Sequence, residues 1–125
     1  MSESQEIKEI KRAYAELETL YHTYFPKSDP CLIDDLLRRL KKNPNTPPIY
    51  MEVFTMSGVD TEAAEKYFFE KTGLVPAIYD NGTHYVTNHK LTLEMLKEIS
   101  DSADVLEVAG DIKCHSIKKY VGRYT

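Results

Sequence analysis

The sequence contains no apolar run of the about 18 residues that a transmembrane helix needs. Its first residues, Met1 to Glu6, are polar and acidic and lack the apolar core of a signal peptide. Cysteine is scarce, and the two in the chain, Cys31 and Cys114, lie far apart in sequence. Without a secretory signal we expect a cytoplasmic protein in which both cysteines are free thiols.

Motifs for metal, cofactor and nucleophile chemistry are also missing. No CxxC, HxxxH or carboxylate–histidine cluster occurs, and His84 and His89, five apart on a predicted strand, should point to opposite faces. The five glycines are dispersed as turn residues, so no glycine-rich phosphate loop is present. Cys114 stands between Lys113 and His115, which would lower the pKa of an exposed thiol. The sequence predicts no metal and no cofactor and favours a protein that is not an enzyme, although catalytic groups can also meet only in space.

The charge is unevenly spread along the 125 residues, which carry −4 in total. Residues 1–42 are balanced, with eight acids and eight bases, whereas residues 43–111 hold twelve acids and four bases. Residues 112–125 carry four bases and no acid. The central stretch should therefore repel nucleic acid and anionic membranes, and only the tail should attract them.

Residues 48–111 are predicted to form, in order, a strand, a helix, a β-hairpin, a helix and a strand. Asn81-Gly82 predicts a type I′ hairpin turn, which places Tyr79 opposite His84. The order β-α-β-β-α-β matches the ferredoxin-like split βαβ arrangement, an α+β fold with a four-stranded antiparallel sheet. Right-handed crossovers would place the first and third strands in the centre and both helices on one face.

Two further helices are predicted before this module, at about 4–24 and 30–42, with Ser4 and Asp29 as N-caps. The proline-rich segment 43–48 can be neither helix nor central strand. We therefore divide the chain into an N-terminal helical arm with a helical hairpin, 1–42, and an α+β module with a short basic tail, 43–125. Together they should form one compact domain.

The first helix has its apolar residues on one side. They follow a 3-4-3-4-3 spacing that resembles heptad a and d positions; they are Ile7, Ile10, Tyr14, Leu17, Tyr21 and Tyr24. Fewer than three heptads are present, so the pattern fits either a helix packed on its own domain or a dimer seam. Tyr14 and Tyr21 are the candidate partner-binding residues here, because a tyrosine hydroxyl needs water or a partner.

The sheet face away from the helices is the second candidate surface. If Glu52 faces solvent, Tyr50 and Phe54 share its face, and Tyr85 joins them in one of two possible registers. These aromatics resemble in placement the stacking residues of RNA-recognition sheets, but Glu52 and Glu107 would repel phosphates. We expect the helical arm or a second subunit to cover this face, with a small ligand or a peptide as alternatives.

Two groups of basic residues favour nucleic-acid binding as an alternative function. The tail has Lys113, Lys118, Lys119 and Arg123 interleaved with tyrosines, a combination that suits single-stranded nucleic acid or an acidic partner. The second predicted helix ends in Arg38, Arg39, Lys41 and Lys42, which complement the helix dipole or form a phosphate-binding patch.

The sequence as a whole favours a non-catalytic interaction or regulatory module. It would bind a partner protein, or a second copy of itself as a homodimer, through the arm and the open sheet face. The alternatives are a nucleic-acid-associated protein using the basic tail, and a small-ligand sensor with Cys114, His84 and His89 as its polar groups. No membrane partner is expected.

Overall fold

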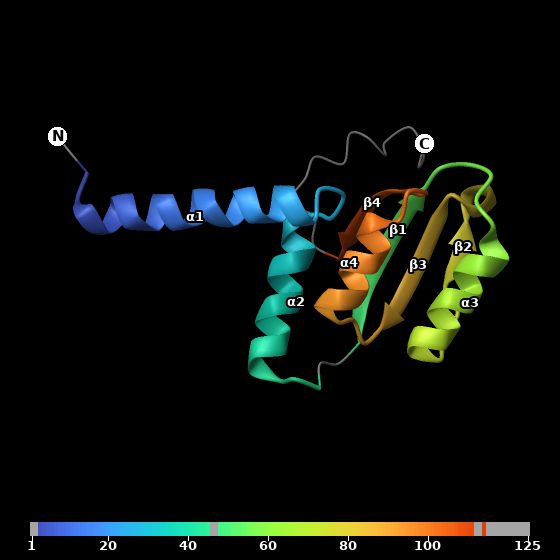
Figure 1. Cartoon of the computed structure of the whole chain (residues 1–125). Helices are drawn as coiled ribbons and strands as arrows, with labels where there is room; N and C mark the ends of the chain where they lie inside the picture. Colours follow the sequence, from blue (N-terminus) through green and yellow to red (C-terminus); the bar gives the residue numbers. More distant parts are fainter. Residues whose placement is uncertain (1–2, 46–47, 112–113, 115–125) are drawn as a thin grey trace.

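The chain folds as an α+β protein with an antiparallel four-stranded sheet (Figure 1). This computed structural model describes residues 3–45, 48–111 and 114. The elements along the chain are α1 (Gln5–Tyr24), α2 (Pro30–Lys42), β1 (Ile49–Thr55), α3 (Thr61–Thr72), β2 (Ala77–Tyr79), β3 (His84–His89), α4 (Leu93–Asp101) and β4 (Val105–Gly110). No helix in the described ranges is both long and apolar enough to cross a bilayer.

Local sequence fixes where the helices begin and end. Each helix has an N-cap side chain that accepts a hydrogen bond from a backbone N–H of the first turn, which satisfies a donor that the helix leaves open. The caps predicted for the first two helices, Ser4 and Asp29, are confirmed. Ser4 caps α1, Asp29 caps α2, Asp60 caps α3 and Thr92 caps α4. Gly73 ends α3 with a φ of 79°, a left-handed conformation that favours glycine.

The predicted hairpin turn is confirmed in its geometry. Asn81 and Gly82 have φ values of 56° and 90°, and the Thr83 N–H donates to the Asp80 carbonyl at 3.2 Å. Both positive φ angles belong to a type I′ turn, whose twist matches that of the strands. The register that follows, with Tyr79 opposite His84, is also as predicted.

The strands lie in the order β2-β3-β1-β4, and every neighbouring pair is antiparallel. In Figure 1, α3 and α4 lie on one face of the sheet and α2 lies beside α4. The odd positions of β1, Ile49, Met51 and Val53, face these helices as predicted. The hydrophobic core forms between them and the apolar stripes of α2 and α4, which include Leu32, Ile33, Leu36, Leu96 and Ile99.

Helix α1 extends away from the rest of the molecule (Figure 1). None of its residues is buried, so packing of α1 along α2, as in a helical hairpin, is not shown. After α1 the chain passes along β4. The Asp29 N–H donates to the Val108 carbonyl and the Val108 N–H donates to the Lys27 carbonyl, both at 2.8 Å. These bonds fix the start of α2 beside β4.

Candidate functional site

Five of the six residues in the apolar stripe of α1 are exposed. Leu17 has 39% of its surface exposed, and Ile10 and Tyr14 reach 64%. We call the set Ile7, Ile10, Tyr14, Leu17 and Tyr24 the α1 seam; the exposed fraction of its members lies between 39% and 64%. Twenty residues make a helix of about 30 Å. The seam is therefore a long, narrow apolar surface without a partner in the described part of the chain.

Tyr21, the sixth predicted position of the stripe, has a different role. Its hydroxyl donates to Asp34 Oδ1 on α2 at 2.6 Å. Burial raises the pKa of Tyr21 far above its usual range, and the hydrogen bond and charge of Asp34 add to this effect. The neighbouring Phe25 packs against the core. Together these contacts hold the base of α1, and Tyr14 and Leu17 of the seam border a hollow that Pro30 and Asp34 of α2 also line.

Much of the sheet face that carries Tyr50 and Phe54 is buried, in agreement with the expectation that this face is covered. Phe54 is 1% exposed and Glu52 is 7% exposed. Helix α1 does not supply this cover, because it buries none of its own residues. The imidazole of His84 stacks on the Phe54 ring, with 4.5 Å between the ring centroids. Phe54 is therefore a packed residue within the chain rather than an exposed docking residue.

The same face holds a carboxylate–histidine cluster that sequence reasoning missed. His84 Nε2 lies 3.1 Å from Glu52 Oε1, and His84 Nδ1 lies 3.4 Å from Asp80 Oδ2. Glu52 and His84 come from β1 and β3 and are diagonal neighbours, since Phe54 pairs directly with His84. The contact between Glu52 and His84 depends on the β1–β3 register, which no local motif in the sequence determines, whereas Asp80 and His84 lie on either side of the predicted hairpin turn.

Tyr85 does not share the face of Phe54. It pairs with Val53 on β1, so it points to the helix side and belongs to the hydrophobic core. The sequence left open which face of the hairpin is buried, and the buried face is the one that carries the cross-strand pair Ile78 and Tyr85. His89 also faces the helices and His84 faces away, as predicted for two residues five apart on a strand.

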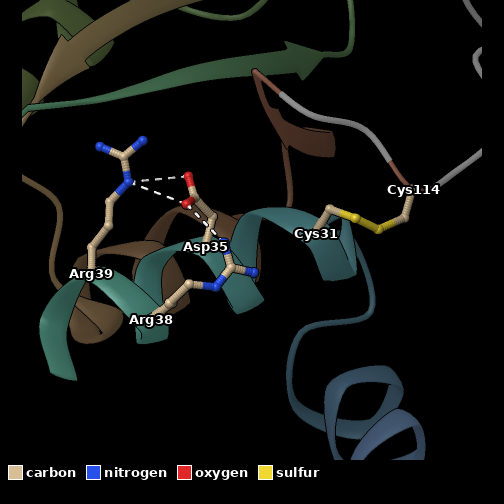
Figure 2. Close-up of polar contacts among 5 residues, drawn as sticks. All are labelled: Cys31, Asp35, Arg38, Arg39 and Cys114. Carbon is tan, nitrogen blue, oxygen red and sulfur yellow. Dashed lines mark hydrogen bonds and ion pairs between the residues drawn. A yellow bond between two sulfur atoms is a disulfide. The ribbon is translucent and has the colours of Figure 1, made fainter. Parts of the chain in front are cut away.

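The expectation of two free thiols is wrong. Cys31 and Cys114 form a disulfide, with their Cα atoms 5.4 Å apart (Figure 2). Cys31 lies in the first turn of α2, and Asp29 holds the facing segment by accepting from the backbone N–H groups of Cys31 and Cys114. A paired Cys114 offers no thiolate for nucleophilic chemistry. The cytoplasmic location expected together with free thiols stays a prediction.

The same three residues have the donor atoms of a metal site. A carboxylate oxygen of Asp29 and the sulfurs of Cys31 and Cys114 lie within 4.8 Å of one another. Metal binding by cysteine needs thiolates, and the disulfide uses both sulfurs. In the disulfide form this cluster is therefore structural.

The basic residues give little geometric support to nucleic-acid binding. On α2, Arg39 Nε lies 3.2 Å from Asp35 Oδ1 and Arg38 lies 3.7 Å from the same atom (Figure 2). One carboxylate thus partly neutralises the two arginines. The tail residues of this prediction, Lys113, Lys118, Lys119 and Arg123, lie outside the described residues.

Comparison with known proteins adds no functional assignment. The sequence matches no protein-family model and no curated protein, and the structure matches no solved structure. A function for this chain has to be argued from its own surfaces. Among the described residues, the α1 seam places five exposed large apolar side chains on one helix.

Proposed function

We propose that this protein is a non-catalytic interaction module that self-associates through the α1 seam. The observation that carries the proposal is the exposure of all five seam side chains on a helix that buries none of its residues. Burial of one such side chain stabilises an assembly by about 1.5–3 kcal/mol. A contiguous apolar stripe of this kind is typical of a protein–protein contact.

A second copy of the chain suits the seam. The 3-4 spacing is that of helices that pair side by side with knobs-into-holes packing. In an antiparallel pair, Tyr14 of one helix faces Leu17 of the other, and Lys11 lies close to Glu18 of the other helix, twice by symmetry. These charges flank the seam and are complementary. The remainder of each chain then lies at opposite ends of the pair.

We infer further that residues 48–111 form a ferredoxin-like split βαβ module that serves as the scaffold for α1. The support is the strand order β2-β3-β1-β4, with β1 and β3 in the centre, antiparallel neighbours, and α3 and α4 on the same face. This fold hosts many unrelated functions and so implies none by itself. Its contribution here is to hold α2, and through Tyr21 and Asp34 the base of α1.

The test is sedimentation velocity of the full chain over a concentration series from about 10 µM to about 1 mM. The wild-type chain should shift from monomer to dimer, and Leu17→Glu should remain a monomer. Loss of Leu17 from both helices removes about 4 kcal/mol, which raises the dissociation constant about a thousandfold.

Thr19→Glu is the matched control, because it introduces the same charge on the opposite side of the same exposed helix. It should associate like the wild type. A wild-type chain that stays monomeric over the whole series, or an equal loss of dimer in both variants, would contradict the proposal.

A further inference from the structure

The sheet face opposite the helices buries two carboxylates at its centre. Glu107 on β4 pairs with Phe54 on β1, so the two side chains share this face, and Glu107 is only 6% exposed. Ala109 pairs with Glu52, and both are buried as well. We call these four residues the acidic face. Glutamate is almost never this deeply buried unless a partner accompanies it.

The helices in the described ranges do not cover the acidic face. Helices α3 and α4 lie on the other face of the sheet (Figure 1), and the buried residues of α2 belong to the core on that side. Helix α1 buries none of its residues. The burial of the acidic face is nevertheless present in a single copy of the chain, so its cover belongs to the chain itself. Of the segments outside the described ranges, only 115–125 is longer than two residues.

The last described residue lies beside this face. Asp29 accepts a hydrogen bond from the Cys114 N–H at 3.0 Å, and its own N–H donates to the Val108 carbonyl at 2.8 Å. Cys114 is therefore held next to β4, close to the acidic face. The eleven residues of 115–125 span about 36 Å when extended, whereas a sheet of four strands is about 15 Å wide. The segment is long enough to cross the whole sheet from this starting point.

The segment and the face have opposite charges. Residues 115–125 contain Lys118, Lys119 and Arg123 and no acid. The acidic face contributes Glu52 and Glu107, and the four described strands contain no lysine or arginine. Burying a carboxylate costs much less when a cation is buried with it. The segment provides such cations, together with tyrosines and aliphatic side chains that suit an apolar surface.

We propose that residues 115–125 dock in cis on the acidic face. Their basic side chains pair with Glu52 and Glu107, and their apolar side chains pack against Phe54. The disulfide at Cys114 fixes the start of the docked segment. The bases of the tail are then used within the chain and not on phosphates, so the acidic face is a site for a basic segment and the tail is not a nucleic-acid site. This docking is independent of the α1 seam.

The first test is nuclear Overhauser effects (NOEs) in the full chain. NOEs should connect the ring protons of Phe54 with side chains of residues 115–125, for which the methyl groups of Ile117 and Val121 are suitable reporters. A mixture of isotope-labelled and unlabelled chains separates contacts within one chain from contacts between two. The NOEs should arise within one chain. Absence of any NOE between Phe54 and the segment, or NOEs only between chains, would overturn the proposal.

The second test is trypsin cleavage after Lys118, Lys119 and Arg123, followed by mass spectrometry of the released fragments. In the full chain this cleavage should be at least about tenfold slower than in a synthetic peptide of residues 115–125, because a docked segment has to open first. Equal rates in the chain and the peptide would overturn the proposal. Protection that appears only when a single-stranded oligonucleotide is added would do the same and would favour nucleic-acid binding.

Variants on the sheet assign the docking surface. Glu52→Gln combined with Glu107→Gln should raise the rate of tail cleavage about fivefold, because the ion pairs are lost. Glu70→Gln is the matched control, since Glu70 is exposed on α3 on the other side of the sheet, and its tail should be cleaved like that of the wild type. An equal rise in both variants would overturn the assignment.

A reciprocal variant on the tail avoids any change to the buried face. Lys118→Gln combined with Lys119→Gln should raise the rate of cleavage after Arg123 about fivefold and weaken the NOEs to Phe54. This variant keeps every described residue, so it tests the charge pairing even if the sheet variant fails to fold. An unchanged rate with unchanged NOEs would show that these bases do not hold the segment and would overturn the proposed pairing.

Discussion

Reduction of the Cys31–Cys114 disulfide should lower the free energy of unfolding by several kcal/mol. The bond joins residues 83 apart in sequence, so it closes a loop that contains the whole sheet. In the oxidised unfolded chain this loop stays closed, which removes much of its conformational freedom. Reduction restores that freedom and therefore stabilises the unfolded state.

The expected size follows from the length of the loop. The chain-entropy relation gives about 4.5 kcal/mol for a loop of this length at 25 °C. The folded state should change little, because Asp29 accepts hydrogen bonds from the backbone of Cys31 and Cys114 whether or not the sulfurs are joined. At about 3 °C per kcal/mol, the unfolding midpoint should fall by about 15 °C.

The assay is urea denaturation followed by circular dichroism, with the oxidised protein and with the protein in a phosphine reductant. Cys31→Ser combined with Cys114→Ser should reproduce the reduced curve and should not respond to the reductant. Equal midpoints for the oxidised and reduced protein, with the disulfide verified by mass spectrometry, would refute the reasoning.

Two other predictions concern the base of the arm. Asp29→Ala should lower the free energy of unfolding by about 2 kcal/mol, because the cap of α2 and an acceptor for the Cys114 N–H are lost. Asp29→Asn is the control, since its side chain keeps an acceptor. If urea denaturation showed the same loss of stability in Asp29→Asn as in Asp29→Ala, this explanation would be contradicted. The raised pKa of Tyr21 means that the folded state keeps its phenol proton above pH 10, where the unfolded chain loses it. The stabilisation from the Tyr21 hydroxyl should therefore be complete below about pH 10 and decrease as the pH rises further. In Tyr21→Phe, the unfolding midpoint should decrease less steeply with pH in this range. An unchanged dependence of the midpoint on pH would count against the Tyr21–Asp34 contact.

Local features of the fold could be predicted from the sequence because a few adjacent residues determine them. Ser4 and Asp29 are N-caps through bonds to residues three and two positions later, and Asn81-Gly82 forms its turn within four residues. The periodicity of β1 likewise placed Met51 and Val53 on the helix side. The caps, the hairpin turn and the strand periodicity all depend on conformational preferences of residues that lie within a few positions of one another in the sequence.

The features that were missed depend on contacts between distant segments. The pairing of Cys31 with Cys114 requires the start of α2 to lie beside β4, which no local pattern specifies. The contact between Glu52 and His84 needs the β1–β3 register, and that register is set only when the core assembles.

The short parallel bridge between Ser28 and Val108 has a further consequence for aggregation. An edge strand usually offers free N–H and C=O groups to which a foreign strand can add. At the β4 edge, the backbone N–H and C=O of Val108 are already bonded to Lys27 and Asp29. At the opposite edge, β2 is only three residues long and follows Pro76, which has no N–H to donate. Both edges of the described sheet thus have a feature that disfavours strand addition, which is relevant in a chain that also carries an exposed apolar helix.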